Sequence, residues 1–278
     1  MSKSPIPRSM LLNPVLPKNA SIKIVGLGGI GSIVSRYLAT FLAAQRQNCK
    51  LTFIDGDDFE PKNSARMLFK DFGNKAEVVA QDLEDYFEGS KLTILTVPEY
   101  LKKDNIDELL QEDDIIILCV DNHSTRKLVS THCAKLKNVT LFSGGNDGVE
   151  KKDNGRNLRG TYGNCQVYAR RDGEDRSPSL TLYHPEIENP ADKLPSDISC
   201  TDLIMSVPQI MFVNLAAASC ILNTVWLYLC NTLHYSEISF DIADGAMNPW
   251  PTPAPDLPGY LLKKEKKEVM EAMEAVSE

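Results

Sequence analysis

The sequence lacks the features that mark several protein classes. Its seven cysteines form no Cys-x-x-Cys pair, which argues against a zinc site and against a disulfide framework, and their odd number fits a reducing cytoplasm. The chain has 38 acidic and 30 basic residues, a net charge of −8, so we expect no nucleic-acid partner. Residues 1–7 have no long apolar core or cleavage site, so we expect no signal peptide and a cytoplasmic location.

One apolar stretch, residues 210–230, is long enough to cross a bilayer. It contains Asn214 and Asn223, begins just after Pro208, and has no flanking cluster of positive charge. A helix that is apolar all round lies in a core or in a membrane. We favour a buried core helix and no membrane partner, with a transmembrane span as the alternative.

Strand and helix patterns alternate up to residue 145, and the stretch at 114–120 is almost wholly apolar, as in the centre of a parallel sheet. This alternation predicts an α/β fold with a doubly wound, Rossmann-like, mostly parallel sheet. The predicted strands are 21–25, 50–54, 92–96, 114–120 and 139–143, and the predicted helices are 31–44, 73–87, 104–111 and 124–136.

The pattern changes after residue 145. We expect a small antiparallel appendage with a strand at 161–170, a proline-containing surface loop at 172–195, and a closing strand at 237–242. The expected domains are an N-terminal arm (1–20), a main domain (21–250) and a Pro-rich linker with a charged tail helix (247–278). The main domain divides into a nucleotide-binding part (21–145), a crossover and cysteine loop (146–200), and the long apolar helix with the closing strand (201–246).

A glycine-rich loop follows the first predicted strand and opens the first predicted helix. Its glycines are Gly26, Gly28, Gly29 and Gly31. Glycines let the backbone approach a phosphate, and a helix N-terminus presents free N–H groups, so the loop predicts nucleotide binding. A merely tight strand-to-helix turn is the alternative. Asp55 ends the second strand, where a carboxylate can accept hydrogen bonds from the ribose of either NAD or ATP.

Further charged and amide residues distinguish these two nucleotides. Two cations and extra carboxylates suit a triphosphate that reacts better than a pyrophosphate that is only held. Arg66 and Lys75 can neutralise charge that develops on phosphates, and Asp121 can hold Mg²⁺. Each residue alone could instead be a solvated charge or a helix cap. The set is Asp57, Asn63, Arg66, Lys75, Asp121, Asn122 and Arg126.

These residues resemble a known family. Asp55-x-Asp57 with Asn63 and Arg66 is similar to the D-x-D…N-x-x-R pattern of the ThiF/MoeB and ubiquitin-activating-enzyme superfamily. The glycine loop and the Asp121-Asn122-x-x-x-Arg126 stretch match that family as well. The resemblance is strong over 21–145 and weaker to about residue 251. The second half looks most like stand-alone ThiF-type proteins of bacterial and phage operons, including the PRTRC-associated group, which have a similar cysteine before a long apolar helix.

The resemblance implies a reaction. Members of the family bind Mg-ATP and adenylate the C-terminal glycine carboxylate of a ubiquitin-like or sulfur-carrier protein, and many then form a cysteine thioester. It implies that Asp55 binds the ribose, that Asn63, Arg66 and Lys75 bind the phosphates, and that Asp121 binds Mg²⁺. The segment between Arg66 and Lys75 is shorter than is usual in the family. No zinc is expected, because the paired cysteines of many relatives are missing.

Two more residues and the assembly follow from the resemblance. Cys200 stands where ThiF-type proteins keep a reactive cysteine, and a polar helix start lowers the pKa of a thiol. Cys165 is the second candidate, and a structural thiol is the alternative for Cys200. Arg8 is the candidate for the arginine that a partner subunit supplies in the family, which implies a homodimer. The acceptor could be a ubiquitin-like protein, a sulfur carrier or a short peptide. The competing functions are a non-catalytic nucleotide-binding scaffold and an NAD-dependent oxidoreductase.

Overall fold

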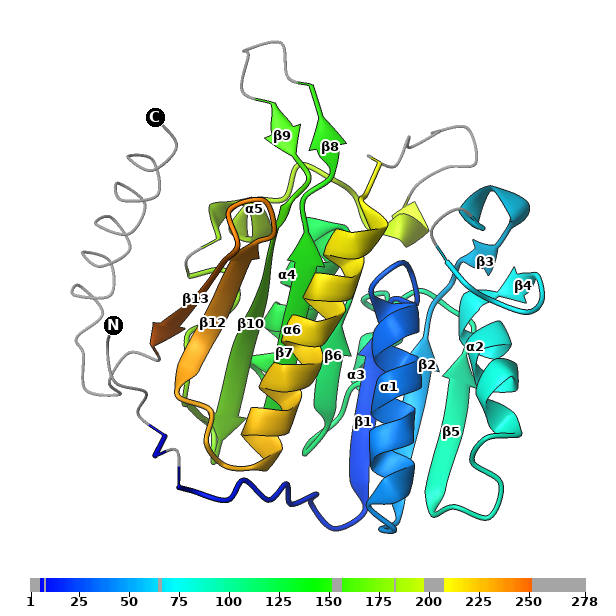
Figure 1. Cartoon of the computed structure of the whole chain (residues 1–278), viewed down its shortest axis with the longest axis vertical. Helices are drawn as coiled ribbons and strands as arrows, with labels where there is room; N and C mark the ends of the chain where they lie inside the picture. The colour runs from blue at the N-terminus through cyan, green and yellow to red at the C-terminus, as the bar shows by residue number, and fades with distance from the viewer. Residues whose placement is uncertain are drawn as a thin grey trace.

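A computed structural model describes residues 6–7, 9–64, 67–151, 157–182, 184–197 and 208–251. Within these residues the main body is a nine-stranded sheet with helices on both faces (Figure 1). Three of the expected site residues, Arg8, Arg66 and Cys200, and the expected tail helix lie outside the described residues.

The parallel half of the sheet carries the nucleotide-binding pattern. Its strands are β1 (Ala20–Val25), β2 (Cys49–Ile54), β5 (Leu92–Val97), β6 (Ile115–Leu118) and β7 (Val139–Asn146). They lie in the order β5-β2-β1-β6-β7, and every neighbouring pair is parallel. The chain proceeds from β1 to one side and later returns to the other, so the strand order reverses between β1 and β6. The predicted doubly wound α/β class is confirmed, and ligands of such sheets bind at this reversal.

The antiparallel strands continue the same sheet beyond β7. The strand β10 (Tyr162–Arg171) pairs with β7 on one side and with β12 (Tyr235–Asp241) on the other, and β11 (Glu174–Asp175) pairs with the end of β10. The antiparallel part predicted from the sequence therefore widens the central sheet instead of standing apart from it.

The outer edge of the sheet differs from the sequence prediction. The sequence analysis places a Pro-rich linker from residue 247 onward, but β13 (Ala246–Pro251) pairs with β12 as an edge strand. Pro249 lies opposite Ile238 within this pairing. Proline is tolerated there because, within the described residues, β13 is an edge strand and its outer side needs no N–H donor.

Helices cover both faces and enclose two cores. On one face α1 and α6 pack against each other and lie side by side in Figure 1. Each core joins one face of the sheet to its own helices. The first face carries α1 (Gly31–Ala44), α2 (Lys75–Glu84) and α6 (Met211–Leu229), and the second carries α3 (Ile106–Leu109), α4 (His123–Cys133) and α5 (Pro185–Glu188).

Several short elements decorate the carboxyl edge of the parallel strands. Two small antiparallel pairs and two single 3₁₀ turns lie in the connections. They are β3 (Asp58–Phe59) with β4 (Gly73–Asn74), β8 (Val149–Glu150) with β9 (Leu158–Arg159), and turns at Pro61–Asn63 and Pro195–Asp197.

The long apolar helix α6 packs against β7, β10 and α1. In the part of the chain that the structure describes, it is the one helix long and apolar enough to cross a membrane, and half of its most apolar stretch is buried inside the protein. Val213, Ala217 and Ile221 are fully buried, whereas Phe212 and Leu215 are exposed. The helix therefore has an inner face that belongs to the core and an outer apolar face.

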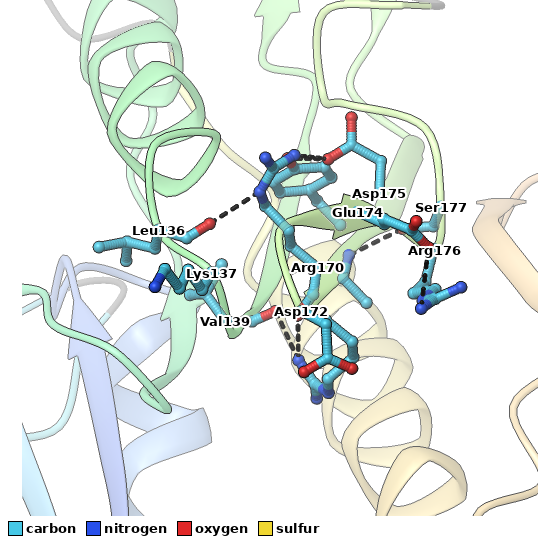
Figure 2. Close-up of polar contacts among 12 residues, drawn as sticks. Leu136, Lys137, Val139, Arg170, Asp172, Glu174, Asp175, Arg176 and Ser177 are labelled. Carbon is cyan, nitrogen blue, oxygen red and sulfur yellow. Dashed lines mark hydrogen bonds and ion pairs between the residues drawn. The ribbon is translucent and has the colours of Figure 1, made fainter.

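The β10–β11 hairpin lies at the amino ends of the parallel strands, opposite their carboxyl ends (Figure 2). Arg170 Nε donates to the Leu136 carbonyl at 2.7 Å, and its guanidinium pairs with Asp175. Arg171 Nη1 donates to the Val139 carbonyl at 2.9 Å. These contacts tie the hairpin to the connection between α4 and β7. They engage backbone carbonyls just before and at the amino end of β7.

Candidate functional site

The glycine loop joins β1 to α1 at the reversal of strand order. Gly26 has a φ of +87°, and a Cβ there would lie 3.0 Å from the carbonyl carbon of Cys119 on the neighbouring chain segment. A Cβ at Gly31 would lie 1.8 Å from the carbonyl oxygen of Gly26. The packing of the loop itself therefore requires glycine at these two positions.

Gly28 is different, because nothing in the described protein crowds it. The nearest atom to a Cβ at this position would be Cε of Met67, at 3.9 Å. The next helix begins at Gly31, and the side chain of its N-cap, Ile30, makes no capping hydrogen bond. Open backbone at Gly28 beside an uncapped helix N-terminus fits the close approach of a phosphate group.

Asp55 fastens this loop to the end of β2. Its Oδ2 accepts a hydrogen bond from the N–H of Leu27 at 2.5 Å, and its Oδ1 accepts one from the N–H of Asp57 at 2.8 Å. Burial raises the pKa of the Asp55 carboxyl and outweighs the opposing effects of Lys75 and the two N–H groups. Each carboxylate oxygen keeps a second lone pair that could accept a hydrogen bond from a ribose hydroxyl. The role predicted for Asp55 at the ribose stays a prediction.

Lys75 and Asp57 form an ion pair next to the loop. Lys75 Nζ lies 2.8 Å from Asp57 Oδ2, and the Lys75 side chain is almost buried whereas that of Asp57 is half exposed. The Tyr100 hydroxyl donates to the other oxygen of Asp57. Burial, and then the hydrogen bond to Asp57, raise the pKa of Tyr100. Gly56 leaves room for this ring, because a Cβ there would lie 2.6 Å from Cγ of Tyr100.

Asn63 and Asn122 are engaged in local capping. Asn63 Oδ1 accepts from the N–H of Glu60 at 3.0 Å within the turn at Pro61–Asn63. Asn122 is the N-cap of α4, and its Oδ1 accepts from the N–H of Thr125 at 2.8 Å. Each amide keeps its Nδ2 donor group outside these caps. Their predicted contacts with a nucleotide stay predictions.

Asp121 and Arg126 lie at the same edge and have different surroundings. Asp121 follows β6 and its residue is exposed. Arg126 is buried and donates to Ser143 Oγ at 2.6 Å and to the Val120 carbonyl at 2.7 Å, with a third bond to the Gly144 carbonyl at 3.0 Å. Burial lowers the pKa of its guanidinium. Arg126 therefore joins the ends of β6 and β7. Its guanidinium is buried, whereas Asp121 is exposed.

The crossover loop is held down by charged contacts that the sequence analysis missed. The Asp192 carboxylate accepts from the N–H groups of His123 and Ser124, at 2.7 and 2.8 Å, and so caps α4 from outside the helix. His184 lies between Glu186 (2.8 Å) and Glu237 (3.0 Å). Burial disfavours its charged form, but the bonds to both carboxylates outweigh this and raise the pKa of His184 to about 9. The 184–192 stretch is therefore held to β12 through Glu237 and to the start of α4 through Asp192.

The cysteines that the sequence places on strands and helices are mostly buried in this structure. Cys119, Cys133 and Cys220 are buried, and burial raises the pKa of each thiol to about 12. Cys165, the second candidate nucleophile, is completely buried in the core that β10 shares with α6, and burial raises its thiol pKa well above the usual value. This thiol is inaccessible and protonated, so the structure argues against Cys165 as the nucleophile. Cys200 lies outside the described residues.

The side chains at this site could serve a nucleotide-bound metal ion but do not form a metal site by themselves. Among the described residues there is no group of three or more His, Cys, Asp or Glu side chains that could hold a metal ion. Nucleotide-bound Mg²⁺ takes one or two carboxylates and completes its shell with phosphate oxygens and water. The exposed carboxylate of Asp121 fits that lesser requirement.

The fold and the glycine loop define a doubly wound α/β protein of the Rossmann kind. The model of the ThiF family matches residues 17–240, which is most of the chain. The protein therefore belongs to the ThiF family. The narrower likeness to the PRTRC-associated group stays a prediction.

Named relatives share part of this chain. Over 133 residues it is 33% identical to the adenylyltransferase and sulfurtransferase MOCS3-2 of Zea mays, covering 47% of this chain and 26% of that protein. It is 24% identical over 135 residues to the protein HesA, heterocyst, of Trichormus variabilis, covering 48% of each. The chain thus spans about a quarter to a half of the length of these relatives.

Solved structures share the fold. The structure of E. coli MccB with ATP has a TM-score of 0.60 and 18% identity, covering 84% of this chain and 64% of that one. The structure of MccB with AMPCPP and MccA has a TM-score of 0.61 and 17% identity, covering 86% and 66%. At this level of identity the likeness concerns the fold.

Proposed function

We propose that the protein uses ATP to adenylate a carboxylate at the end of a protein or peptide. The observation that carries the proposal is the open backbone of Gly28 beside the uncapped start of α1, with the Lys75–Asp57 pair next to the loop. Membership of the ThiF family, the adenylyltransferase name of the maize relative and the ATP and AMPCPP in the MccB structures support it.

In this proposal the residues at the carboxyl edge divide the work. The N–H groups of the glycine loop, up to the start of α1, bind the phosphates, and Lys75 adds positive charge beside them. Asp55 would bind the ribose and Asn63 the phosphates, as their motif positions imply. Arg66 keeps the phosphate role that its motif position implies. Asp121 would hold Mg²⁺, which would neutralise charge on the phosphates when bound.

The proposed reaction is a displacement at the α-phosphorus of ATP. A carboxylate oxygen of the acceptor attacks the α-phosphorus, an oxygen–phosphorus bond forms, and the bond from the α-phosphorus to the bridging oxygen breaks. Pyrophosphate leaves with that electron pair, and no proton has to move. The protein's part is to align the two reactants and to stabilise the charge on the phosphates.

The acceptor that we propose is the C-terminal glycine of a ubiquitin-like or sulfur-carrier protein, or of a short peptide. One of the MccB structures is a complex with MccA, and the maize relative is named a sulfurtransferase as well as an adenylyltransferase. A thioester on Cys200 would be a second step, in which the thiolate attacks the acyl carbon and AMP leaves. Cys200→Ala should then abolish the thioester and leave adenylation intact.

We also propose a homodimer. Tyr37 of α1 and Phe212, Met211 and Leu215 of α6 are large apolar side chains that are exposed on two helices in contact with each other. A second copy of this surface would bury them, since a symmetric dimer places the same patch against itself.

Ligand-induced stabilisation tests the nucleotide step without a known acceptor. A ligand that binds only the folded state raises the unfolding temperature. We expect stabilisation by Mg-ATP and none by NAD⁺ or NADH, and a smaller effect of Mg-ATP on Asp121→Ala. Stabilisation by NAD⁺ or NADH alone would overturn the proposal in favour of an oxidoreductase. Full stabilisation of Asp121→Ala would remove the Mg²⁺ assignment.

A further inference from the structure

Asn214 of α6 is a buried amide without hydrogen bonds. Its residue has 0% exposure, and neither Oδ1 nor Nδ2 has a partner among the described residues. Asn223, on the same helix, is exposed, and its Nδ2 donates to Ser219 at 3.3 Å. A buried amide without partners costs free energy that an apolar residue of similar size would not.

This amide points at the glycine loop. A Cβ at Gly29 would lie 2.3 Å from Nδ2 of Asn214, which is far too close for a side chain. The φ of Gly29 lies outside the left-handed region that only glycine adopts readily, so its backbone conformation does not explain the residue. A side chain at position 29 would therefore displace the Asn214 amide. Figure 1 shows the start of α6 next to the loop that precedes α1.

We propose that Asn214 is a positioning residue of the nucleotide site, whose carboxamide hydrogen-bonds the glycine loop when a nucleotide phosphate occupies that loop. The inference rests on the proposed binding of ATP and adds a residue that no motif marks. Asn214 acts through the loop backbone and not on the phosphate itself.

The geometry of the peptide group supplies the reason. A trans peptide directs its N–H and its C=O to opposite sides. When an N–H group of the loop turns toward a phosphate, the carbonyl of the same peptide turns away from it. Glycines flank this stretch, so the rotation meets little steric resistance. An amide on the other side of the loop can then donate Nδ2 to that carbonyl, and the missing partner of Asn214 is supplied.

The contact would also link the loop to α6. Gln209, which precedes the helix, places its Oε1 3.7 Å from the same Cβ position at Gly29. The Val149 N–H donates to the Pro208 carbonyl at 2.8 Å, so the segment that leads into α6 is also held to β8. Nucleotide binding would therefore fix the start of α6 as well as the loop.

The test compares two leucine substitutions on one helix. Asn214→Leu replaces the amide with an apolar side chain of similar size, and Asn223→Leu is the exposed control. Unfolding temperatures are measured for wild type and both variants without nucleotide and across a range of Mg-ATP concentrations. We expect Asn214→Leu to keep or exceed the nucleotide-free stability of wild type, and to bind Mg-ATP about tenfold more weakly. Asn223→Leu should bind Mg-ATP as wild type does.

The outcomes separate the two proposals. Asn214→Leu with wild-type affinity for Mg-ATP would overturn the role of Asn214 and leave the proposed function standing. A large loss of nucleotide-free stability would also overturn it, because the amide would then serve the resting fold. If Asn214→Leu does not fold, Asn214→Ala removes the amide without adding volume, and failure of both marks a structural residue. A wild type that Mg-ATP does not stabilise would overturn the proposed function, and this inference with it.

Discussion

Replacing His184 should weaken the fold in a way that depends on pH. The imidazole lies between Glu186 and Glu237, and its side chain is 16% exposed. Its pKa is raised from 6.5 to about 9 in the folded protein. At roughly 1.4 kcal/mol for each pKa unit, the rise from 6.5 to about 9 means that the charged imidazolium contributes at most about 3.5 kcal/mol to the free energy of unfolding. His184→Gln should remove most of this contribution.

The sign follows from the direction of the shift. Because the folded pKa lies above the unfolded one, the contribution is complete below pH 6.5 and is lost as the pH rises through about 9. Urea unfolding of wild type and His184→Gln between pH 6 and pH 10 measures the difference. We expect the gap in free energy of unfolding to be largest at pH 6 and to shrink toward pH 10. A gap that stays constant, or that grows with pH, would refute the argument from His184.

Four other substitutions are informative. Gly28→Ala should change stability by less than about 1 kcal/mol, because its Cβ meets only Met67, yet weaken Mg-ATP binding; Gly31→Ala should instead cost about 2 kcal/mol or more in urea unfolding, since its Cβ would lie 1.8 Å from a carbonyl oxygen. Arg126→Met should lower the free energy of unfolding by about 3 kcal/mol in the same assay, because it leaves the Val120 and Gly144 carbonyls without their donor. An unchanged unfolding curve would contradict the view that Arg126 joins the ends of β6 and β7. Phe212→Glu should shift the protein toward a monomer in sedimentation, whereas a wild type that is already monomeric would remove the proposed dimer.

The sequence predicts the fold well because the fold depends on repeating patterns. The alternation of apolar strands and amphipathic helices up to residue 145 corresponds to β1, β2, β5, β6 and β7 with α1, α2, α3 and α4, with ends within a few residues of those observed. The glycine loop was identifiable for the same reason, since its spacing and its place between a strand and a helix are local features. Packing requires glycine at positions 26 and 31 but not at position 28. The sequence does not predict this difference, because it depends on contacts in three dimensions.

Contacts between distant segments account for what the sequence analysis missed. Tyr100 reaches Asp57 from the end of another strand, and Asp192 reaches α4 from a loop that looked structureless. No periodicity marks such residues, because each is defined by a partner far away in the chain. Asn122 belongs to a motif of the family but acts in this structure as a helix cap, which its place before a helix could have indicated. The strand β13 was missed because its prolines resemble a linker.

The fate of the nucleotide tests the central claim most directly. The protein is incubated with Mg²⁺, with ATP labelled in its α- and γ-phosphates, and with a peptide that ends in glycine, and the products are separated. Adenylation predicts pyrophosphate in an amount equal to AMP, either free or attached to the peptide carboxylate, and loss of both products in Asp121→Ala. ADP with inorganic phosphate, or no turnover of ATP by a protein that binds it, would contradict the proposal that this member of the ThiF family is an adenylating enzyme.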